Sequence, residues 1–164
     1  MNEELKIGDV FYTFSPDIDY VSFGFEKRVY GNIKYGEFEV IKINEKSVIT
    51  KNRIQIGCSW GTKRKKSSLL DMPKTKERLL SLIKNRTDGI IKAYEIEKGK
   101  YTKKAPEFYV ANLWIMTLKL SKKLGEGGLE LEAIKEANVK IVQEAKKVEE
   151  KIIQLNQLEK EHKK

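Results

Sequence analysis

The amino-acid sequence predicts an α+β protein: a small SH3-like or OB-like antiparallel β-barrel or meander with an inserted short basic helix, followed by a C-terminal α-helical hairpin. Apolar residues alternate with polar ones from Leu5 to about Trp60, which is the period of a strand. From Pro106 onward they follow helical spacing. We therefore expect a β-rich domain at residues 1–100 and a helical hairpin at residues 101–164.

The β-rich region is expected to hold about five short strands, because aromatic and β-branched residues recur at alternate positions. The strands are expected at residues 10–14, 21–25, 38–43, 47–50 and 54–56. Residues with turn chemistry separate the runs, at 15–17, 31–32, 35–36 and 44–45. The last of these separators is short enough to predict a tight hairpin.

A short amphipathic helix is expected over residues 73–86, where Pro73 suits the first turn and Asp71 a capping position. Asp88 and Gly89 then predict a turn. Residues 90–96 are expected to form a sixth strand that returns to the edge of the barrel. The basic loop and helix, residues 61–86, would thus be an insertion within the β-rich domain.

Two helices, about 106–124 and 129–160, are expected to form the hairpin, since the Gly-Glu-Gly-Gly run at 125–128 stops the first one. The second helix carries a coiled-coil-like seam with one polar position. Its members are Ile134, Asn138, Ile141, Ala145, Val148, Ile152 and Leu155.

The second helix either folds back wholly on the first or overhangs it, and its greater length favours an overhang. The exposed seam would then bind a second copy of the chain or a partner protein, and a frayed helix end is the alternative. The predicted partner-binding residues are Val148, Ile152, Leu155 and Leu158.

Composition excludes several classes of protein. No stretch reaches the roughly 18 apolar residues of a membrane span, and the acidic start lacks the order of a signal peptide, so we expect a cytoplasmic protein. One cysteine, Cys58, and one histidine, His162, cannot form a disulfide or an ordinary zinc site. We expect no metal and no cofactor.

Three features could carry catalysis, and each has a simpler interpretation. Residues 57–61 spell Gly-Cys-Ser-Trp-Gly, the G-x-S-x-G pattern of a hydrolase with Ser59 as nucleophile, but a lysine cluster follows where a helix is needed. Cys58 beside cations could be a thiolate or a half-buried structural residue. The carboxylate pairs Asp17 with Asp19 and Glu37 with Glu39 are interpreted as ordinary surface acids. We expect no enzymatic activity.

Net charge gives the strongest functional signal. Residues 51–110 hold sixteen Lys and Arg against six Asp and Glu, whereas the first fifty hold six against nine, so the formal charge of +9 is concentrated in one block. Such a block predicts a polyanionic partner, of which nucleic acid is the commonest. The predicted contact residues are Lys51, Arg53, Lys63, Arg64, Lys65, Lys66, Lys74, Lys76 and Arg78. A solvated loop that binds nothing is the alternative.

The excess of Lys over Arg, 28 to 5, favours attraction to the phosphate backbone over bidentate readout of bases. It also fits an AT-rich genome, which suggests a low-GC bacterium, its phage or a mobile element. Ten of the fifteen aromatic residues lie in the first sixty, where most belong in a barrel core. One or two could stack bases, from Tyr12, Tyr20, Tyr30, Tyr35 and Trp60.

The leading hypothesis is therefore a non-enzymatic protein that binds DNA or RNA through its central basic block. The rival is a protein-interaction inhibitor that blocks a host nuclease or defence complex, an anti-defence or anti-CRISPR type of protein. In that case the basic block would meet an acidic protein surface, or nucleic acid already held by the target. Binding of free nucleic acid near physiological salt discriminates between the two.

Overall fold

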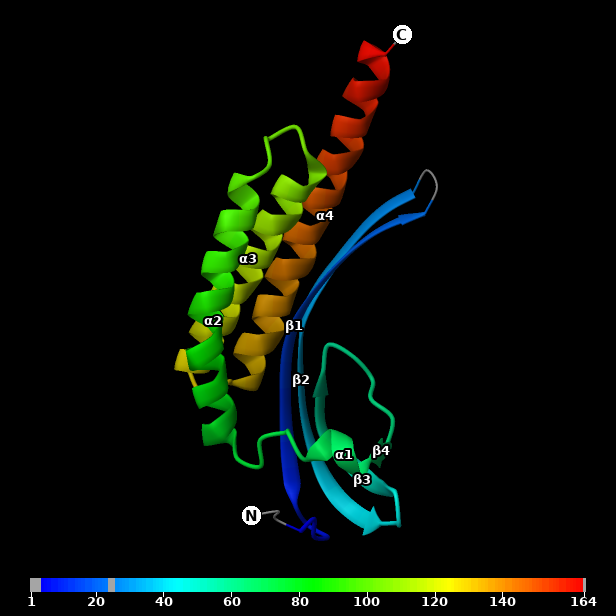
Figure 1. Ribbon diagram of the computed structural model, residues 1–164, viewed down its shortest axis with the longest axis vertical. Helices are drawn as coiled ribbons and strands as arrows, with labels where there is room; N and C mark the ends of the chain where they lie inside the picture. Colours follow the sequence, from blue (N-terminus) through cyan, green and yellow to red (C-terminus); the bar gives the residue numbers. More distant parts are fainter. Residues whose placement is uncertain (1–3, 24–25, 164) are drawn as a thin grey trace. The chain divides into compact units, whose positions relative to one another are not determined.

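The computed structural model describes residues 4–23 and 26–163, which form four strands and four helices within those ranges (Figure 1). In chain order these are β1 (Val10–Phe23), β2 (Glu26–Ile43), β3 (Ser47–Ile56), β4 (Lys63–Lys65), α1 (Lys66–Leu69), α2 (Lys76–Gly99), α3 (Pro106–Glu126) and α4 (Leu131–His162). Strands precede helices, so the predicted α+β class is confirmed.

The chain divides into two compact units, and each combines segments distant in sequence. The first unit contains residues 1–15 and 34–82, and the second contains residues 16–33 and 83–164. Strands β1 and β2 therefore contribute one part of their length to each unit.

The sheet is antiparallel, with the strand order β1-β2-β3-β4, and it curls into half a barrel in the first unit (Figure 1). The predicted hairpin at residues 44–45 is confirmed: Asn44 N–H donates to the Ser47 carbonyl at 2.8 Å. Two irregularities in the pairing of β2 with β3, between Glu37 and Phe38 and between Val40 and Lys42, mark bulges. Bulges increase the local twist and bend the sheet.

The core of the first unit lies inside this curl. Its buried cluster consists of Phe11, Val40, Val48 and Leu69, with Leu5, Ile43 and Met72 packed against it. Leu69 comes from α1, so this one-turn helix contributes to the interior of the half-barrel. The edge of β1 forms a hydrogen bond with the segment that precedes α2: the Tyr12 N–H donates to the Pro73 carbonyl at 2.9 Å. Covering an edge in this way removes a free donor that another chain could pair with.

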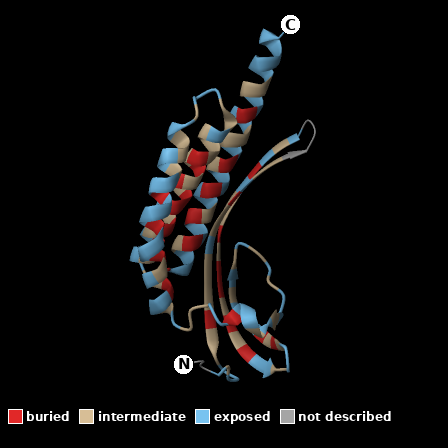
Figure 2. Ribbon diagram, viewed as in Figure 1, coloured by how far each residue is buried: buried red, intermediate tan, exposed pale blue. Residues whose placement is uncertain are grey.

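In the second unit, three helices pack against one another, and α4 also packs against residues 26–33 of β2 (Figure 1). The face between α2 and α3 contains Ile91, Ile115 and Leu118, and beside it Tyr94 stacks on Trp114 with ring centroids 5.1 Å apart. Buried residues, red in Figure 2, gather on the sides of the helices that face each other. The unit is thus held by one stripe of apolar residues on each helix.

Asn138 of α4 holds the edge of β2 through two hydrogen bonds. Its Oδ1 accepts from the Ile33 N–H at 2.6 Å, and its Nδ2 donates to the Ile33 carbonyl at 3.0 Å. Farther along α4, Glu149 Oε1 accepts from the Val29 N–H at 3.2 Å. Side chains of α4 therefore supply hydrogen-bond partners to backbone groups of β2 in the second unit.

Gly31 permits this close packing. A Cβ atom at this position would lie 2.6 Å from Ile18 Cδ1 and 2.8 Å from Ile141 Cγ2. Only glycine leaves space for the helix to approach the strand so closely. The expected turn at residues 31–32 is therefore wrong, because this glycine serves helix–strand packing within a continuous strand.

Two other expected turns are also wrong. Residues 15–17 lie inside β1, and residues 35–36 lie inside β2. Pro16 is tolerated because β1 is at the edge of the sheet, where a missing N–H need not break a ladder of hydrogen bonds. At Gly36 a Cβ atom would lie 2.7 Å from Phe38 Cζ, so the glycine makes room for that ring. The expected run at 21–25 continues β1 as far as Phe23, and its last two residues lie outside the described part of the chain.

The expected helix at 73–86 and strand at 90–96 form one longer helix, α2. Buried Ile83, Thr87 and Ile91 are spaced by four residues, which is a helical pattern that runs through the expected turn. The cap is Thr75, whose Oγ1 accepts from the Arg78 N–H at 3.1 Å, and not Asp71. Three helices therefore take the place of the expected two-helix hairpin, with α3 and α4 within two residues of their expected bounds.

Candidate nucleic-acid interface

Strand register gathers lysines on the outer face of the half-barrel. Lys42 of β2 pairs with Ile49 of β3, and Ile49 pairs in turn with Lys63 of β4. Directly opposed residues of antiparallel strands share a face of the sheet, so these three side chains form a row across it. Both lysines of the row are exposed.

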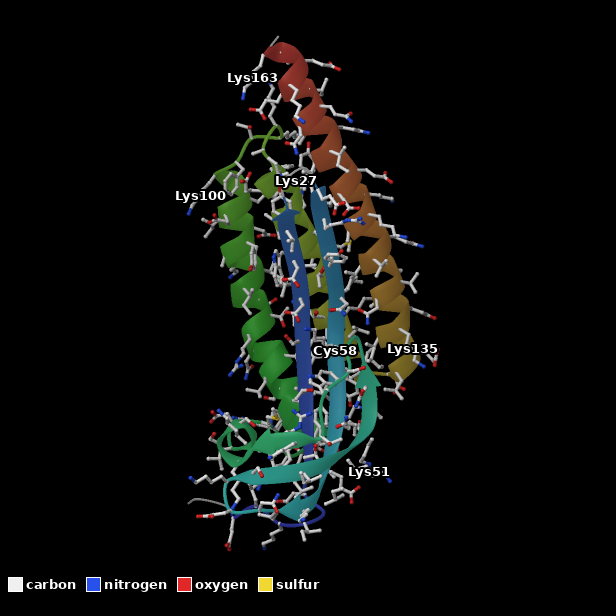
Figure 3. All side chains as sticks on the ribbon, turned by 90° about the vertical axis from the view of Figure 1, so that its right-hand side faces the viewer. Lys27, Lys51, Cys58, Lys100, Lys135 and Lys163 are labelled. Atoms are coloured by element: carbon white, nitrogen blue, oxygen red, sulfur yellow. The ribbon has the colours of Figure 1, made fainter. Side chains whose placement is uncertain are left out.

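Two more lysines lie on the same face of the sheet, because side chains two residues apart on a strand point to the same side. Lys51 lies two residues after Ile49, and Lys65 lies two residues after Lys63. Both are exposed, and Figure 3 shows the Lys51 side chain extending away from the ribbon. We call the four residues Lys42, Lys51, Lys63 and Lys65 the outer lysine face. Among the described residues none of the four forms an ion pair.

Charge on this face is predominantly positive. Glu39, half-buried, pairs directly with Lys51 and offsets part of its charge. Arg53 is exposed and follows Lys51 on β3, at the bulge where Phe38 pairs with Asn52 and Glu37 pairs with Ile54. Because it has no partner in this register, we leave it out of the outer lysine face.

Arg64 has a different environment from Lys63 and Lys65. Its guanidinium carbon lies 3.9 Å from the centroid of the Phe38 ring, and its Nε donates to Thr50 Oγ1 at 3.3 Å. Burial lowers the pKa of the guanidinium. The run Lys63 to Lys66 is thus not one exposed cluster: Arg64 packs inside the half-barrel, and Lys66, half-buried, begins α1.

The remaining predicted contacts lie around the start of α2. Lys74 is half-buried, with its Nζ 4.0 Å from Asp9 Oδ2 and 5.9 Å from the centroid of Phe11. Lys76, half-buried, and Arg78, exposed, belong to the first turn of α2. These cations belong to a separate segment from the strands that carry the outer lysine face.

Lys42 is the residue that sequence reasoning missed. The first fifty residues carry a net negative charge, so a prediction based on the charge of each segment did not select Lys42. The available signal was its position two residues before the hairpin at residues 44–45, combined with the alternation of β2. Extending that register across the hairpin would have placed Lys42 on the same face as Ile49.

The candidate stacking residues have different environments. Tyr35 is fully buried, and burial together with its hydroxyl bond to Glu37 Oε1, 2.7 Å long, raises its pKa. Tyr12 and Trp60 are half-buried in the first unit. In the second unit Tyr20 is half-buried and Tyr30 is 57% exposed. Only Tyr12 and Trp60 therefore belong to the same unit as the outer lysine face and retain exposed surface.

The predicted partner-binding residues on α4 differ in burial. Ile152 is fully buried within the chain, Val148 and Leu155 are half-buried, and Leu158 is 52% exposed. We expected the far half of the seam to be exposed in a single chain. This expectation is wrong at Ile152, which other residues of the chain bury completely. Near this point β2 lies beside α4, because the Val29 N–H donates to Glu149 Oε1 at 3.2 Å.

The two candidate nucleophiles, Ser59 and Cys58, both lie in the loop between β3 and β4. Ser59 is exposed in the loop between β3 and β4, so a strand follows this motif where a nucleophile elbow requires a helix. Cys58 is a half-buried free thiol in the same loop, labelled in Figure 3. In the described part of the chain no three His, Cys, Asp or Glu residues are grouped closely enough to hold a metal ion.

Comparison of the chain with protein-family models, with curated proteins and with solved structures found no match. Among the described helices, none combines the length and the apolar character that crossing a membrane requires.

Proposed function

We propose that this protein is a non-enzymatic binding protein that captures the phosphate backbone of nucleic acid on its outer lysine face. The observation that carries the proposal is the row formed by Lys42, Ile49 and Lys63 across three paired strands. Adjacent strands lie about 4.8 Å apart, and successive residues on one face of a strand about 7 Å apart. The four ammonium groups are therefore anchored within reach of neighbouring phosphates.

Electrostatics give this binding a definite character. Each lysine that neutralises a phosphate releases condensed counterions, so the logarithm of the affinity falls linearly with the logarithm of salt concentration. Lysine ammonium groups act as point charges and do not read base edges as arginine forks do. The proposed binding is consequently sensitive to salt and insensitive to sequence.

Several finer assignments belong to the same proposal. The half-barrel would be of the SH3-like or OB-like kind, the exposed end of α4 would bind a second copy or a partner protein, and the protein would act in the cytoplasm. The exposed apolar residues at that end of α4 are Ile153 and Leu158, at 41% and 52% exposure. These assignments follow from the sequence patterns given above.

The test is equilibrium binding to labelled single- and double-stranded DNA and RNA across a salt series. The variant replaces Lys42, Lys51, Lys63 and Lys65 by alanine and spares Arg64, because changing Arg64 would confound lost charge with lost packing. A control variant replaces four exposed lysines of α3 and α4, Lys119, Lys123, Lys140 and Lys146, and removes the same charge.

We expect wild type and control to bind at roughly 150 mM salt, and the slope of the test variant to be shallower by up to about four, one for each lysine. Equal weakening by both variants would assign binding to net charge alone and contradict the proposed face. No binding of free nucleic acid by the wild type would overturn the proposal and favour the rival, an inhibitor that docks on a protein complex.

A further inference from the structure

Three buried polar atoms lack a hydrogen-bond partner within the described residues, and all three surround one aromatic ring. They are Thr13 Oγ1, Asn52 Oδ1 and Arg64 Nη2. Buried polar atoms are nearly always paired in folded proteins, and an unpaired charged donor is especially costly. Three such atoms around one side chain leave hydrogen-bonding capacity that a water molecule or a ligand can satisfy.

The ring is that of Phe38. Arg64 stacks on its face at 3.9 Å, and Asn52 is its cross-strand partner on β3. Thr13 approaches from β1: a Cβ atom at Gly36 would lie 2.7 Å from Phe38 Cζ and 3.0 Å from Thr13 Oγ1. Strands β1, β2, β3 and β4 thus each contribute one member of the cluster.

Trp60 closes the cluster from the loop between β3 and β4. Its ring meets Phe38 edge-on with centroids 5.4 Å apart, and its carbonyl accepts from Asn52 Nδ2 at 2.9 Å. The loop has a glycine near each end: Gly57 at φ +89°, and Gly61, which has open space where a Cβ would lie. Gly57, Ser59, Gly61 and Thr62 are exposed, so this loop lies at the surface, where segments are more mobile than in the core.

The unpaired atoms define the chemistry of a complementary ligand. Arg64 offers a donor, Asn52 offers an acceptor, and the Thr13 hydroxyl offers both. The phosphodiester of a nucleic-acid backbone carries no donor, so it cannot donate a hydrogen bond to Asn52 Oδ1. The edge of a nucleobase carries donors and acceptors side by side, and its face stacks on aromatic rings such as that of Trp60.

We propose that Thr13, Asn52, Trp60 and Arg64 form a binding site for one unstacked base of a single-stranded nucleic acid, which the base enters when Trp60 leaves the edge of Phe38. This inference rests on the proposed function and names its substrate as single-stranded. Strand β4 links the two sites, because Arg64 lies on it between Lys63 and Lys65. Lys63 and Lys65 face the other side of β4, which is the edge strand of the sheet, so the flanking phosphates would reach them where the nucleic acid passes around this edge.

Trp60 fluorescence tests the site directly. In a Trp114→Phe variant Trp60 is the remaining tryptophan, since the sequence has two. The probes are a short mixed-sequence DNA strand, the same strand annealed to its complement, and a strand of the same length with abasic sugars. We expect the single strand to change the emission, and the duplex and the abasic strand to leave it unchanged at saturation.

A second variant keeps the test independent of that background. Trp60→Leu should weaken binding of the single strand about tenfold and leave duplex binding within about twofold, because stacking is lost while the lysines remain. Trp60→Phe, which retains a ring, should restore most of the affinity. Thermal melts followed by circular dichroism identify any variant that fails to fold. If Trp114→Phe fails to fold, the emission of Trp60 is obtained as the difference between the spectra of the wild type and of Trp60→Phe.

The outcomes separate the two proposals. The base site is contradicted if duplex and single strand change the Trp60 emission equally, or if Trp60→Leu binds both probes like the wild type. Neither result contradicts the outer lysine face. A wild type that binds no probe overturns both. Lysine variants that weaken every probe, together with a Trp60→Leu variant that weakens only the single strand, support both.

Discussion

At the scale of single residues, Arg64 and its neighbours differ in their environments although they are adjacent in sequence. Strand alternation turns Lys63 and Lys65 outward, and it turns Arg64 onto Phe38. A guanidinium suits this position better than an ammonium, because its flat, weakly hydrated surface stacks on a ring. A run of cations in sequence therefore contains two kinds of residue with separate roles.

Stability measurements should separate those roles. Arg64→Ala should lower the free energy of unfolding by about 1–2 kcal/mol, since it removes the cation–π contact and the packing of the side-chain stem. The double variant Lys63→Ala with Lys65→Ala should change it by less than about 0.5 kcal/mol, because both side chains are exposed. Urea denaturation at neutral pH measures both, and equal losses in the two variants would contradict the assignment of Arg64.

At the scale of secondary-structure elements, α4 and β2 are joined by polar side chains as well as by apolar packing. Asn138 is the one polar position of the α4 seam, and it binds both backbone groups of Ile33. A shift of the strand by one residue would leave these groups without partners and would bring a side chain to the place of Gly31. The amide and the glycine together therefore define the register of β2 on α4.

Asn138→Ala should lower the free energy of unfolding by about 2 kcal/mol, because it leaves the N–H and the carbonyl of Ile33 unpaired in a partly buried place. Lys140→Ala, two residues along the same helix and exposed, serves as the matched control and should change stability by less than about 0.5 kcal/mol. Thermal or urea unfolding compares the two. Identical unfolding of both variants would show that Asn138 does not define the register.

At the scale of the whole molecule, the two units are discontinuous in sequence. Residues 16–33 lie within the first fifth of the chain but belong to the same unit as α3 and α4. That unit therefore depends on contacts between residues more than a hundred positions apart, such as Ile33 with Asn138 and Val29 with Glu149. Contacts of this range form late and at a high entropic cost.

A fragment of residues 83–164 should consequently be helical but loosely packed. Without residues 16–33 it exposes the seam around Ile141, so we expect binding of a hydrophobic dye and a broad thermal transition, in contrast to the full chain. Adding a fragment of residues 1–82 should suppress dye binding. A cooperative transition of the isolated fragment at the temperature of the full chain would contradict this account.

Features that depend on a local pattern can be predicted from the amino-acid sequence. The α+β class, the hairpin at 44–45 and the bounds of α3 and α4 follow from hydrophobic period, turn residues and helix stops, all read within a few positions. The concentration of positive charge in residues 51–110 was also visible in the sequence alone.

Features that depend on residues distant in the sequence follow from tertiary packing and strand pairing. Gly31 and Pro16 resemble turn residues in the sequence, yet they lie inside strands because of close packing by α4 and an edge position. The same holds for the interface: the register of β2, β3 and β4 added Lys42 to the outer lysine face and turned Arg64 away from it. Composition records how many charges a segment has, whereas strand pairing decides which of them share a surface.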